Sequence, residues 1–229
     1  FPTIVSHDTM VNRIVENRYG VGSSVVDGIM RATNIMVSGK TALVIGYGYC
    51  GQGIAQRLRG LGAHVTIVDA APLAQLEAHL EGFRTGVLED LLPGADIVLT
   101  VTGRDAVLKE EHFPLMKNGV VLANAGAFSS EIEIECLKEM ALESDTLRPN
   151  VERFLLDGGK EIFLLAKGNL INLAAGDGNP IEAMDVGLAL QTLSLECLAL
   201  HADTLCKGPQ TVPYEIEQAC AEAALQEWV

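Results

Sequence analysis

Residues 40–69 read KTALVIGYGYCGQGIAQRLRGLGAHVTIVD, and this stretch decides the fold. The apolar run at 41–45 predicts a β-strand, and the helical spacing of apolar residues at 54–61 predicts a helix. A second apolar run at 65–68 predicts another strand. The order of strand, glycine turn, helix and strand is typical of a dinucleotide-binding β-α-β unit.

The glycines between the first strand and the helix have spacing G-x-G-x-x-G, as Gly46, Gly48 and Gly51. Gly46 suits a tight turn, Gly48 admits a pyrophosphate close to the backbone, and Gly51 lets the helix pack closely on the strand. The helix N-terminus offers free N–H groups to phosphate oxygens. Asp69 lies 18 residues after Gly51, where a carboxylate can accept a hydrogen bond from a ribose 2′-hydroxyl.

The residues around Asp69 favour NAD over NADP. A carboxylate repels a 2′-phosphate, and Ala70 and Ala71 supply no compensating cation. Tyr49 and Cys50 open the helix and are further candidate cofactor-binding residues. The helix N-terminus can lower the pKa of a thiol such as Cys50, although we favour the alternative that Cys50 is a small apolar plug behind the turn.

The rest of the chain predicts an α/β fold of the Rossmann type, a doubly wound parallel sheet with helices on both faces and helices at the C-terminal end. Buried strands are expected at 96–102 and 119–123, and two strands at 153–156 and 161–165 joined by Asp157-Gly158-Gly159. A short strand is expected at Val87-Leu88.

Helices are expected at both ends of this sheet. Ser23 and Ser24 can cap a helix that runs to about Met36. A long helix is expected at 181–200, and a last one at 215–228. The long helix is apolar nearly all round, so we expect it to be buried on several sides, either at a subunit interface or in the core.

Three segments follow from this pattern. Residues 1–38 form a lead-in segment and a helix that packs on the cofactor domain, and residues 39–170 form the Rossmann NAD-binding domain. Residues 171–229 form a loop at the nicotinamide side and the C-terminal helices.

Composition narrows the function. The formal net charge of −14 argues against nucleic acid or an anionic membrane as a partner. No apolar run approaches the length of about 20 residues that spans a bilayer. The five cysteines are scattered without a C-x-x-C pair and the five histidines have no metal-ligand spacing, so we expect reduced thiols, a cytoplasmic protein and no metal site.

The chain resembles the NAD-binding half of the S-adenosylhomocysteine hydrolase (adenosylhomocysteinase) family nearly from end to end. The segments with counterparts in that family, in order, are FPTIVSHDTMVNRIVENRYG (1–20), SVVDGIMRATNIMVSGK (24–40), GYGYCGQG (46–53), AHVTIVDAAP (63–72), EGF (81–83), TVTG (100–103), NAGAF (124–128), LLAKGNLINLAAGDGNP (164–180) and VPYEIEQ (212–218).

The resemblance implies a tightly held NAD, a dimer or tetramer of identical subunits, and a set of cofactor contacts. Besides the glycines and Asp69, where the family has Glu, the expected cofactor-binding residues are Asn17, Thr102, Gly103, Ala125, Gly126, Asn172 and Asn179. Asn172 would lie near the nicotinamide amide, since a side-chain amide offers both a donor and an acceptor.

The resemblance also implies that the catalytic positions have changed. The family's lysine corresponds to Asn12, its aspartate to Glu16, its cysteine to Val21, and its two histidines to Ala127 and Asn179. The family's glycine loop has Asp and Lys at the positions of Tyr49 and Gln52. The catalytic residues are therefore unknown, with Glu16 and Asn12 as candidates.

Three functions stay open. The chain is an NAD-binding domain with divergent NAD-dependent chemistry, a catalytically silent regulatory or structural paralogue, or a fragment of a true adenosylhomocysteinase. Expected partners are a nucleoside-type small molecule or an N-terminal substrate domain preceding Phe1, and further copies of the chain.

Overall fold

A computed structural model describes residues 1–228, which form two compact units. One unit is Val21–Gly178, and the other joins Phe1–Gly20 with the residues from Asn179 onward. These boundaries differ from those expected at residues 38 and 170. The reason is that the N-terminal strand pairs with a strand close to the C-terminus, so the two ends of the chain pack together.

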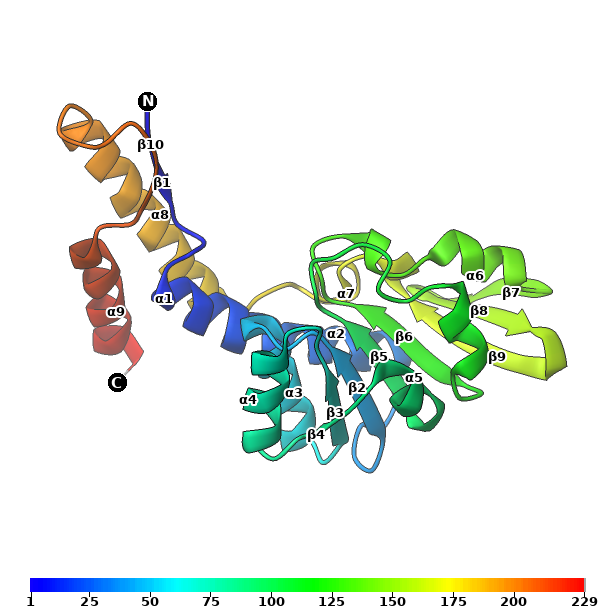
Figure 1. Ribbon diagram of the computed structural model, residues 1–229. Helices are drawn as coiled ribbons and strands as arrows, with labels where there is room; N and C mark the ends of the chain where they lie inside the picture. The colour runs from blue at the N-terminus through cyan, green and yellow to red at the C-terminus, as the bar shows by residue number, and fades with distance from the viewer. Residues whose placement is uncertain (229) are drawn as a thin grey trace. The chain divides into compact units, whose positions relative to one another are not determined.

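The unit Val21–Gly178 is built on one eight-stranded sheet, shown in Figure 1. The strand order is β4-β3-β2-β5-β6-β9-β8-β7. The strands are β2 (Thr41–Ile45), β3 (His64–Val68), β4 (Arg84–Thr85), β5 (Ile97–Thr100), β6 (Val120–Asn124), β7 (Glu143–Arg148), β8 (Val151–Leu156) and β9 (Lys160–Leu165). Pairing is parallel from β4 to β9 and antiparallel for β8 and β7, so the predicted parallel, doubly wound fold is confirmed.

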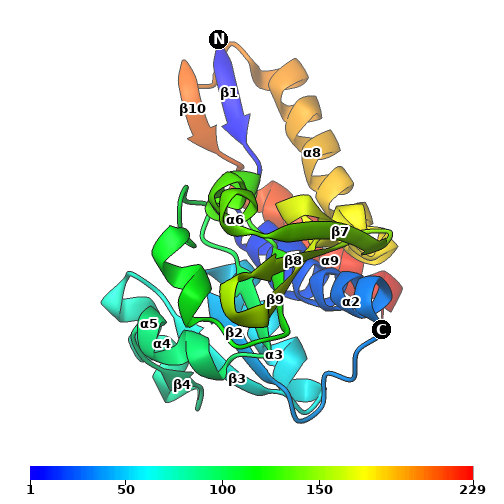
Figure 2. The same ribbon diagram turned by 90° about the vertical axis from the view of Figure 1, so that its right-hand side faces the viewer.

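Helices cover both faces of this sheet, as Figures 1 and 2 show. The helices of the unit are α2 (Gly22–Thr33), α3 (Tyr49–Gly60), α4 (Pro72–Leu80), α5 (Leu88–Leu91), α6 (Ile134–Met140) and α7 (Ile171–Ala174). Short helical turns are η2 (Leu92–Gly94), η3 (Glu110–Leu115), η4 (Ser129–Glu131), η5 (Asp157–Gly159) and η6 (Ala166–Gly168). Alternate residues of β2 enter opposite cores, Val44 beneath α2 and α3 and Leu43 on the other face, as a strand buried on both faces requires.

The predicted hairpin is confirmed as β8 and β9, whereas the edge strands β7 and β4 differ from the prediction. Gly158 and Gly159 have φ of +76° and +78° between β8 and β9. The edge strand β7 was not predicted because its sequence, ESDTLR, is exposed throughout and has no apolar alternation. The strand expected at Val87-Leu88 is wrong, since Leu88 begins α5 and the edge strand β4 ends at Thr85.

The helix α2 also begins and ends earlier than predicted. Ser23 and Ser24 lie inside it, because Val21 before it already has helical backbone angles and no side-chain cap is needed. Asn34 then adopts the left-handed conformation (φ +56°) that ends many helices, ahead of the predicted end at Met36.

The second unit contains two parallel strands and the two C-terminal helices. Its elements are β1 (Pro2–Val5), α1 (Met10–Asn12), the π-helix η1 (Arg13–Val21, of which Val21 belongs to the other unit), α8 (Ile181–His201), β10 (Gly208–Thr211) and α9 (Tyr214–Trp228). A small core forms around Leu190, Val212 and Cys220. The long helix and the last helix are confirmed within one residue of their predicted bounds.

The helix α8 is apolar on its exposed side as well. Ala183, Val186 and Leu190 are buried, whereas Leu188 and Leu195 are exposed. By length and composition, α8 is the single helix in residues 1–228 that could cross a membrane. The sequence prediction concerned an unbroken apolar run, and Glu182, Asp185 and Glu196 interrupt α8, so this finding does not contradict it.

Candidate functional site

The glycine turn after β2 needs its first glycine. Gly46 has φ of +109°, and its N–H donates to the carbonyl of Val68 at 2.8 Å. A Cβ there would lie 2.6 Å from the carbonyl oxygen of Val101. Both the backbone conformation and the close approach of the chain after β5 exclude a side chain at this position.

The next two glycines have different roles. A Cβ on Gly51 would lie 2.1 Å from the carbonyl oxygen of Gly46, so α3 can approach β2 this closely only with glycine. A Cβ on Gly48 would meet nothing within 4 Å. Gly48 precedes α3, whose residues Tyr49 and Cys50 form the first turn, and the open space beside it is where a pyrophosphate could approach the helix N-terminus.

Asp69 directly follows β3 and is already hydrogen-bonded to the chain. Its Oδ2 accepts from the N–H of Tyr47 at 2.7 Å, and its Oδ1 accepts from the N–H of Ala71 at 2.8 Å. A carboxylate oxygen can accept a second hydrogen bond, so a ribose hydroxyl can still be bound. The two backbone donors hold the carboxylate in place for that purpose.

Gly46, Gly48, Asp69 and Thr102 line one cleft of about 570 Å³. Its other lining residues are Ile45, Val68, Ala70, Ala71, Leu88, Val101, Arg104, Asp105, Ala106 and Val107. The cleft lies at the carboxyl ends of β2, β3 and β5, where ligands bind in open parallel sheets. Arg104 adds a positive charge to this lining. It was not predicted, because the sequence argument considered only the residues directly after Asp69, whereas Arg104 follows β5.

Thr102 and Gly103 are held by a residue that the sequence did not single out, Glu131. The hydroxyl of Thr102 donates to Oε2 of Glu131 at 3.0 Å and accepts from the N–H of Arg104 at 3.1 Å. Since its hydrogen is committed to Glu131, Thr102 has no donor left for a cofactor in this arrangement.

Asn124, at the end of β6, organises the loop that follows. Its Oδ1 accepts from the hydroxyl of Thr100 and the N–H of Gly126, both at 2.9 Å. Its Nδ2 donates to the carbonyl oxygens of Phe128 at 3.0 Å and Gly168 at 2.9 Å. Ala125 and Gly126 are buried beside it, whereas Ala127 is exposed. Apart from the resemblance of the segment, no signal in the sequence indicates this role.

Asn172 is not among the lining residues of this cleft, and it carries a buried oxygen atom without a partner among residues 1–228. The residue is 6% exposed, and its Nδ2 donates to the hydroxyl oxygen of Ser24 at 3.3 Å. Its Oδ1 is buried without a hydrogen-bond partner among residues 1–228. An unpaired buried acceptor is costly, and the amide N–H of a nicotinamide is a donor that would satisfy it. Asn172 and the open space at Gly48 therefore fit NAD.

The other candidate residues, Asn12, Glu16, Asn17 and Asn179, belong to the second compact unit. The Nδ2 of Asn12 donates to the carbonyl of His7 at 3.0 Å, and the residue is 9% exposed, so it closes a turn. Burial raises the pKa of Glu16, whose Oε1 lies 1.8 Å from where a Cβ on Gly187 would be.

Asn17 follows Glu16 in η1 and is partly exposed. The side chain of Asn179 lies 3.0 Å from where a Cβ on Gly20 would be. These contacts are all within the second unit.

Burial raises the pKa of the Cys50 thiol to about 11, and the hydrogen bond that lowers it is the weaker effect. The interpretation favoured from the sequence, a small side chain packed behind the turn, agrees with this environment, whereas activation by the helix N-terminus does not. All five cysteines, Cys50, Cys136, Cys197, Cys206 and Cys220, are free thiols. No group of three or more His, Cys, Asp or Glu side chains within residues 1–228 could hold a metal ion.

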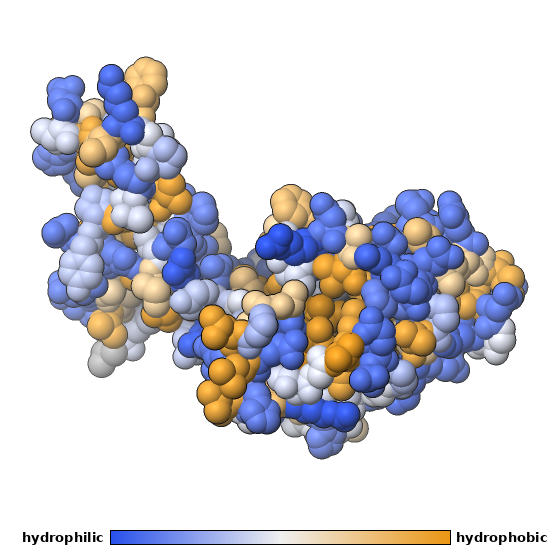
Figure 3. Space-filling model, viewed as in Figure 1, coloured by the Kyte–Doolittle hydropathy of each residue, from blue (hydrophilic) through white to orange (hydrophobic). Residues whose placement is uncertain are grey.

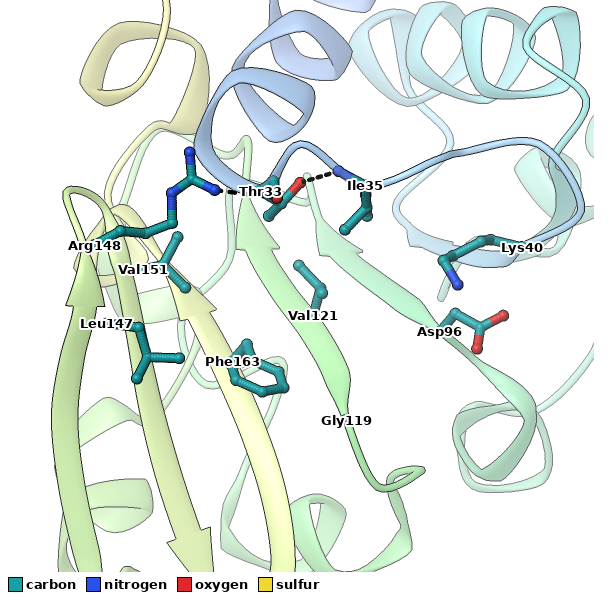
Figure 4. A pocket seen from close by; sticks show the side chains of 10 residues that line it. All are labelled: Thr33, Ile35, Lys40, Asp96, Gly119, Val121, Leu147, Arg148, Val151 and Phe163. Atoms are coloured by element: carbon teal, nitrogen blue, oxygen red, sulfur yellow. Dashed lines mark hydrogen bonds between the residues drawn. The ribbon is translucent and has the colours of Figure 1, made fainter.

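A second, apolar cavity of about 320 Å³ lies at the opposite end of the sheet, shown in Figure 4. Lys40, Asp96 and Gly119 border it just before β2, β5 and β6, and Val121 and Phe163 form its apolar floor. Because it lies at the amino ends of these strands, it is separate from the cleft that Gly48 and Asp69 line.

Comparisons with known proteins identify the family. The family model of the S-adenosyl-L-homocysteine hydrolase NAD binding domain matches residues 17–178. The chain is 44% identical over 227 residues to the S-inosyl-L-homocysteine hydrolase of Methanopyrus kandleri, a match that covers 99% of this chain and 54% of that protein. It is 43% identical over 225 residues to the adenosylhomocysteinase of Aquifex aeolicus, covering 98% of this chain and 54% of that protein.

The chain thus spans about half the length of the curated relatives it matches. Among solved structures, a dipicolinate synthase polypeptide from Bacillus halodurans has a similar fold, with a TM-score of 0.53 and 14% identity. That match covers 60% of this chain and 48% of the other. The chain belongs to the S-adenosyl-L-homocysteine hydrolase family and contains its NAD-binding domain.

Proposed function

We propose that this protein holds NAD for hydride-transfer chemistry on a nucleoside-type substrate other than S-adenosylhomocysteine, which it does not itself hydrolyse. One observation carries the proposal. The cleft at Gly48 and Asp69 fits the cofactor, whereas the resemblance implies that Asn12, Val21 and Ala127 stand where the family has acid and base groups.

The cofactor side of the proposal rests on residues of one compact unit. NAD, when bound, supplies a reversible hydride acceptor. Asp69 would accept from its ribose, Gly48 and the N-terminus of α3 would hold its phosphates, and Asn172 would pair with its amide.

The replaced positions support the second half of the proposal. The amide of Asn12 is committed to the carbonyl of His7 and carries no charge, so it cannot lower the barrier to removing a proton from a sugar hydroxyl. Ala127 and Val21 have no exchangeable side-chain proton at all. Loss of one general acid–base group costs about 10² to 10⁴ in rate, and several are replaced here.

Glu16 is the remaining candidate for moving a proton. Burial raises the pKa of this carboxyl, and a carboxylate with a raised pKa is a stronger base than an exposed one. We propose Glu16 as the general base of the divergent reaction, with Asn17 and Asn179 as neighbouring polar groups.

An activity assay tests the proposal. The protein in its full encoded length, loaded with NAD, is incubated with S-adenosylhomocysteine, and release of adenosine is followed by chromatography beside the Aquifex aeolicus relative as a positive control. We expect adenosine formation at least about a hundredfold below that control. Turnover within a few-fold of the control would sink the proposal.

The same samples address the silent alternative. Candidate alcohols and nucleosides are added one at a time, and NADH absorbance is recorded. A substrate that reduces the bound cofactor supports divergent chemistry. Absence of reduction with every nucleoside and hydroxy acid tested supports a regulatory or structural paralogue instead.

A specific observation favours the third possibility, a true hydrolase. The curated relatives at 40–44% identity carry the names S-inosyl-L-homocysteine hydrolase and adenosylhomocysteinase. S-inosylhomocysteine is therefore included in the assay as a second substrate. Its hydrolysis without that of S-adenosylhomocysteine would place the divergence in the choice of purine.

The exposed apolar side of α8 supports a further macromolecular partner. The chain covers about half of its relatives' length, and Leu188 and Leu195 on α8 are exposed. We propose that an N-terminal substrate domain or a second copy of the chain covers this side of the helix, in a dimer or a tetramer.

A further inference from the structure

Glu131 is a carboxylate with no solvent-exposed surface, and it lies behind the lining of the cleft, where it holds Thr102 and Gly103. It ends the helical turn η4, and its two carboxylate oxygens accept three hydrogen bonds. Oε2 accepts from the N–H and the hydroxyl of Thr102, both at 3.0 Å, and Oε1 accepts from the N–H of Gly103 at 2.7 Å. The side chain therefore fixes the residues that closely follow β5.

The main chain of the same residue fixes the far end of that loop. The carbonyl of Glu131 accepts from the N–H of Val107 at 2.8 Å and of Leu108 at 2.9 Å. Between these points, the N–H of Ala106 donates to the carbonyl of Ser130 at 2.8 Å, and Ala106 has φ of +53°. One residue and its neighbour thus hold both ends of the segment 102–107, most of which lines the NAD cleft.

Gly126 makes room for this carboxylate. A Cβ on Gly126 would lie 1.5 Å from Oε1 of Glu131, a distance that no side chain tolerates. The sequence predicts Gly126 as a cofactor contact, whereas this geometry gives its missing side chain another purpose. Gly126 leaves space for Glu131.

We infer that Glu131 is a positioning residue that shapes the 102–107 wall of the NAD cleft, and that Gly126 is required to admit it. The inference rests on the assignment of the cleft to NAD. The three donors need an acceptor at both oxygens, and a glutamine presents an N–H at one of them. At least one backbone N–H would then face another donor, and the loop would shift.

The Glu131→Gln variant tests the inference by titration with NAD, on protein whose circular dichroism shows it to be folded. We expect the Kd for NAD to rise about tenfold or more. Asp96→Asn is the matched control, since Asp96 accepts from the N–H of Thr41 at 2.9 Å and from Lys117 at 2.5 Å, at the opposite end of the sheet. This control should lose stability and keep the wild-type Kd.

The outcomes separate the inference from its premise. The positioning role is overturned if Glu131→Gln keeps the wild-type Kd for NAD, or if Asp96→Asn loses as much affinity for NAD as Glu131→Gln does. In both cases NAD binding by the wild type stands. If the wild type does not bind NAD, the cleft is not an NAD site, and the positioning role of Glu131 is then overturned as well.

Two further measurements extend the test, and the second holds even where no Glu131 variant folds. In the wild-type background, Gly126→Ala should weaken NAD binding. In the Glu131→Ala background it should cause little further loss of NAD affinity, because the carboxylate that the new methyl group would meet is absent. An equal loss in both backgrounds means that Gly126 contacts NAD directly, and overturns the inference. In the wild type without NAD, the amides of Thr102 and Gly103 should be protected from hydrogen exchange, and exchange at the rate of exposed loops would contradict their bonds to Glu131.

Discussion

Asp69 is held by the fold at the place where we propose that it binds the cofactor. Its two oxygens accept the N–H groups of Tyr47 and Ala71, which keeps the carboxylate at the edge of the cleft. The carboxylate therefore selects its ligand from a fixed position.

Asp69→Ala should raise the Kd for NAD about ten- to a hundredfold, because a hydrogen bond to a charged group contributes about 1.5–3 kcal/mol. Asp69→Glu is the control, since the family has Glu at this position, and it should bind within a few-fold of the wild type. Titration calorimetry measures both. If the alanine variant binds NAD as tightly as the wild type, Asp69 does not contact the cofactor.

Glu16 gives a pH dependence with a definite sign. Burial raises the pKa of its carboxyl in the folded protein above the unfolded value of about 4.3, so folding favours the protonated form. The burial penalty is absent below the unfolded pKa and appears as pH rises through the folded pKa.

Glu16→Gln should therefore be more stable than the wild type at neutral pH, and the difference should vanish by about pH 4. Thermal unfolding across this range measures it. Glu182→Gln is the control, because Glu182 is exposed on α8. Its difference in stability from the wild type should not change with pH. A stabilisation by Glu16→Gln that is equal at both ends of the range would refute the burial argument.

At the scale of elements, the glycine turn separates packing from binding. Gly51 allows α3 to touch the carbonyl of Gly46, whereas Gly48 faces open space. The same type of residue thus meets a packing need at Gly51 and leaves open space at Gly48, where we propose that phosphate binds.

Gly51→Ala should destabilise the protein by about 3 kcal/mol, because the added Cβ overlaps the backbone that follows β2 and the helix must move. Gly48→Ala should unfold at the wild-type temperature and bind NAD at least about tenfold more weakly, since its methyl group occupies the phosphate space. Calorimetry and titration on the pair give both quantities. Loss of stability in Gly48→Ala with an unchanged Kd would reverse the assignment.

The sequence sufficed for elements whose signal is local. The strand, glycine turn, helix and strand at 40–69 are encoded by neighbouring residues, and the structure has them where expected. The strand β7 was missed because its fully exposed residues need no apolar pattern, and its existence depends on β8. A strand at Val87-Leu88 was expected because two apolar residues are consistent with either a strand or a helix.

The wall of the cleft could not be predicted for a similar reason. Glu131 and Thr102 lie 29 positions apart, and nothing in either local sequence indicates their contact. The prediction that Asn12 replaces a lysine of the family rests on the resemblance alone. The hydrogen bond from the amide of Asn12 to the carbonyl of His7 could be found only in the three-dimensional structure.

At the scale of the whole molecule, α4 and α8 each expose several leucines. Figure 3 shows such a patch over α4, where Leu73, Leu76 and Leu80 are exposed. The exposed leucines of α8 are the other set. The helix α8 is apolar on its buried side too, where Leu190 joins a core. Because α8 is apolar on both sides, we expect the partner surface on α8.

Replacing Leu188 and Leu195 together by Glu should shift the protein to a smaller oligomer in sedimentation velocity, because two charges would be buried at the contact. Replacing Leu73 and Leu76 on α4 by Glu is the control and should leave sedimentation unchanged. If the α8 pair sediments as the wild type does, α8 is not the interface between copies.

The proposed chemistry depends on the cleft at the glycine turn being the NAD site. Titration of the wild-type protein with NAD, followed by the same titration with NADP, tests this most directly. We expect saturable binding of one NAD per chain and at least about tenfold weaker binding of NADP, because Asp69 repels a 2′-phosphate. Absence of saturable NAD binding, in protein that mass spectrometry shows to carry no NAD already, would contradict this assignment.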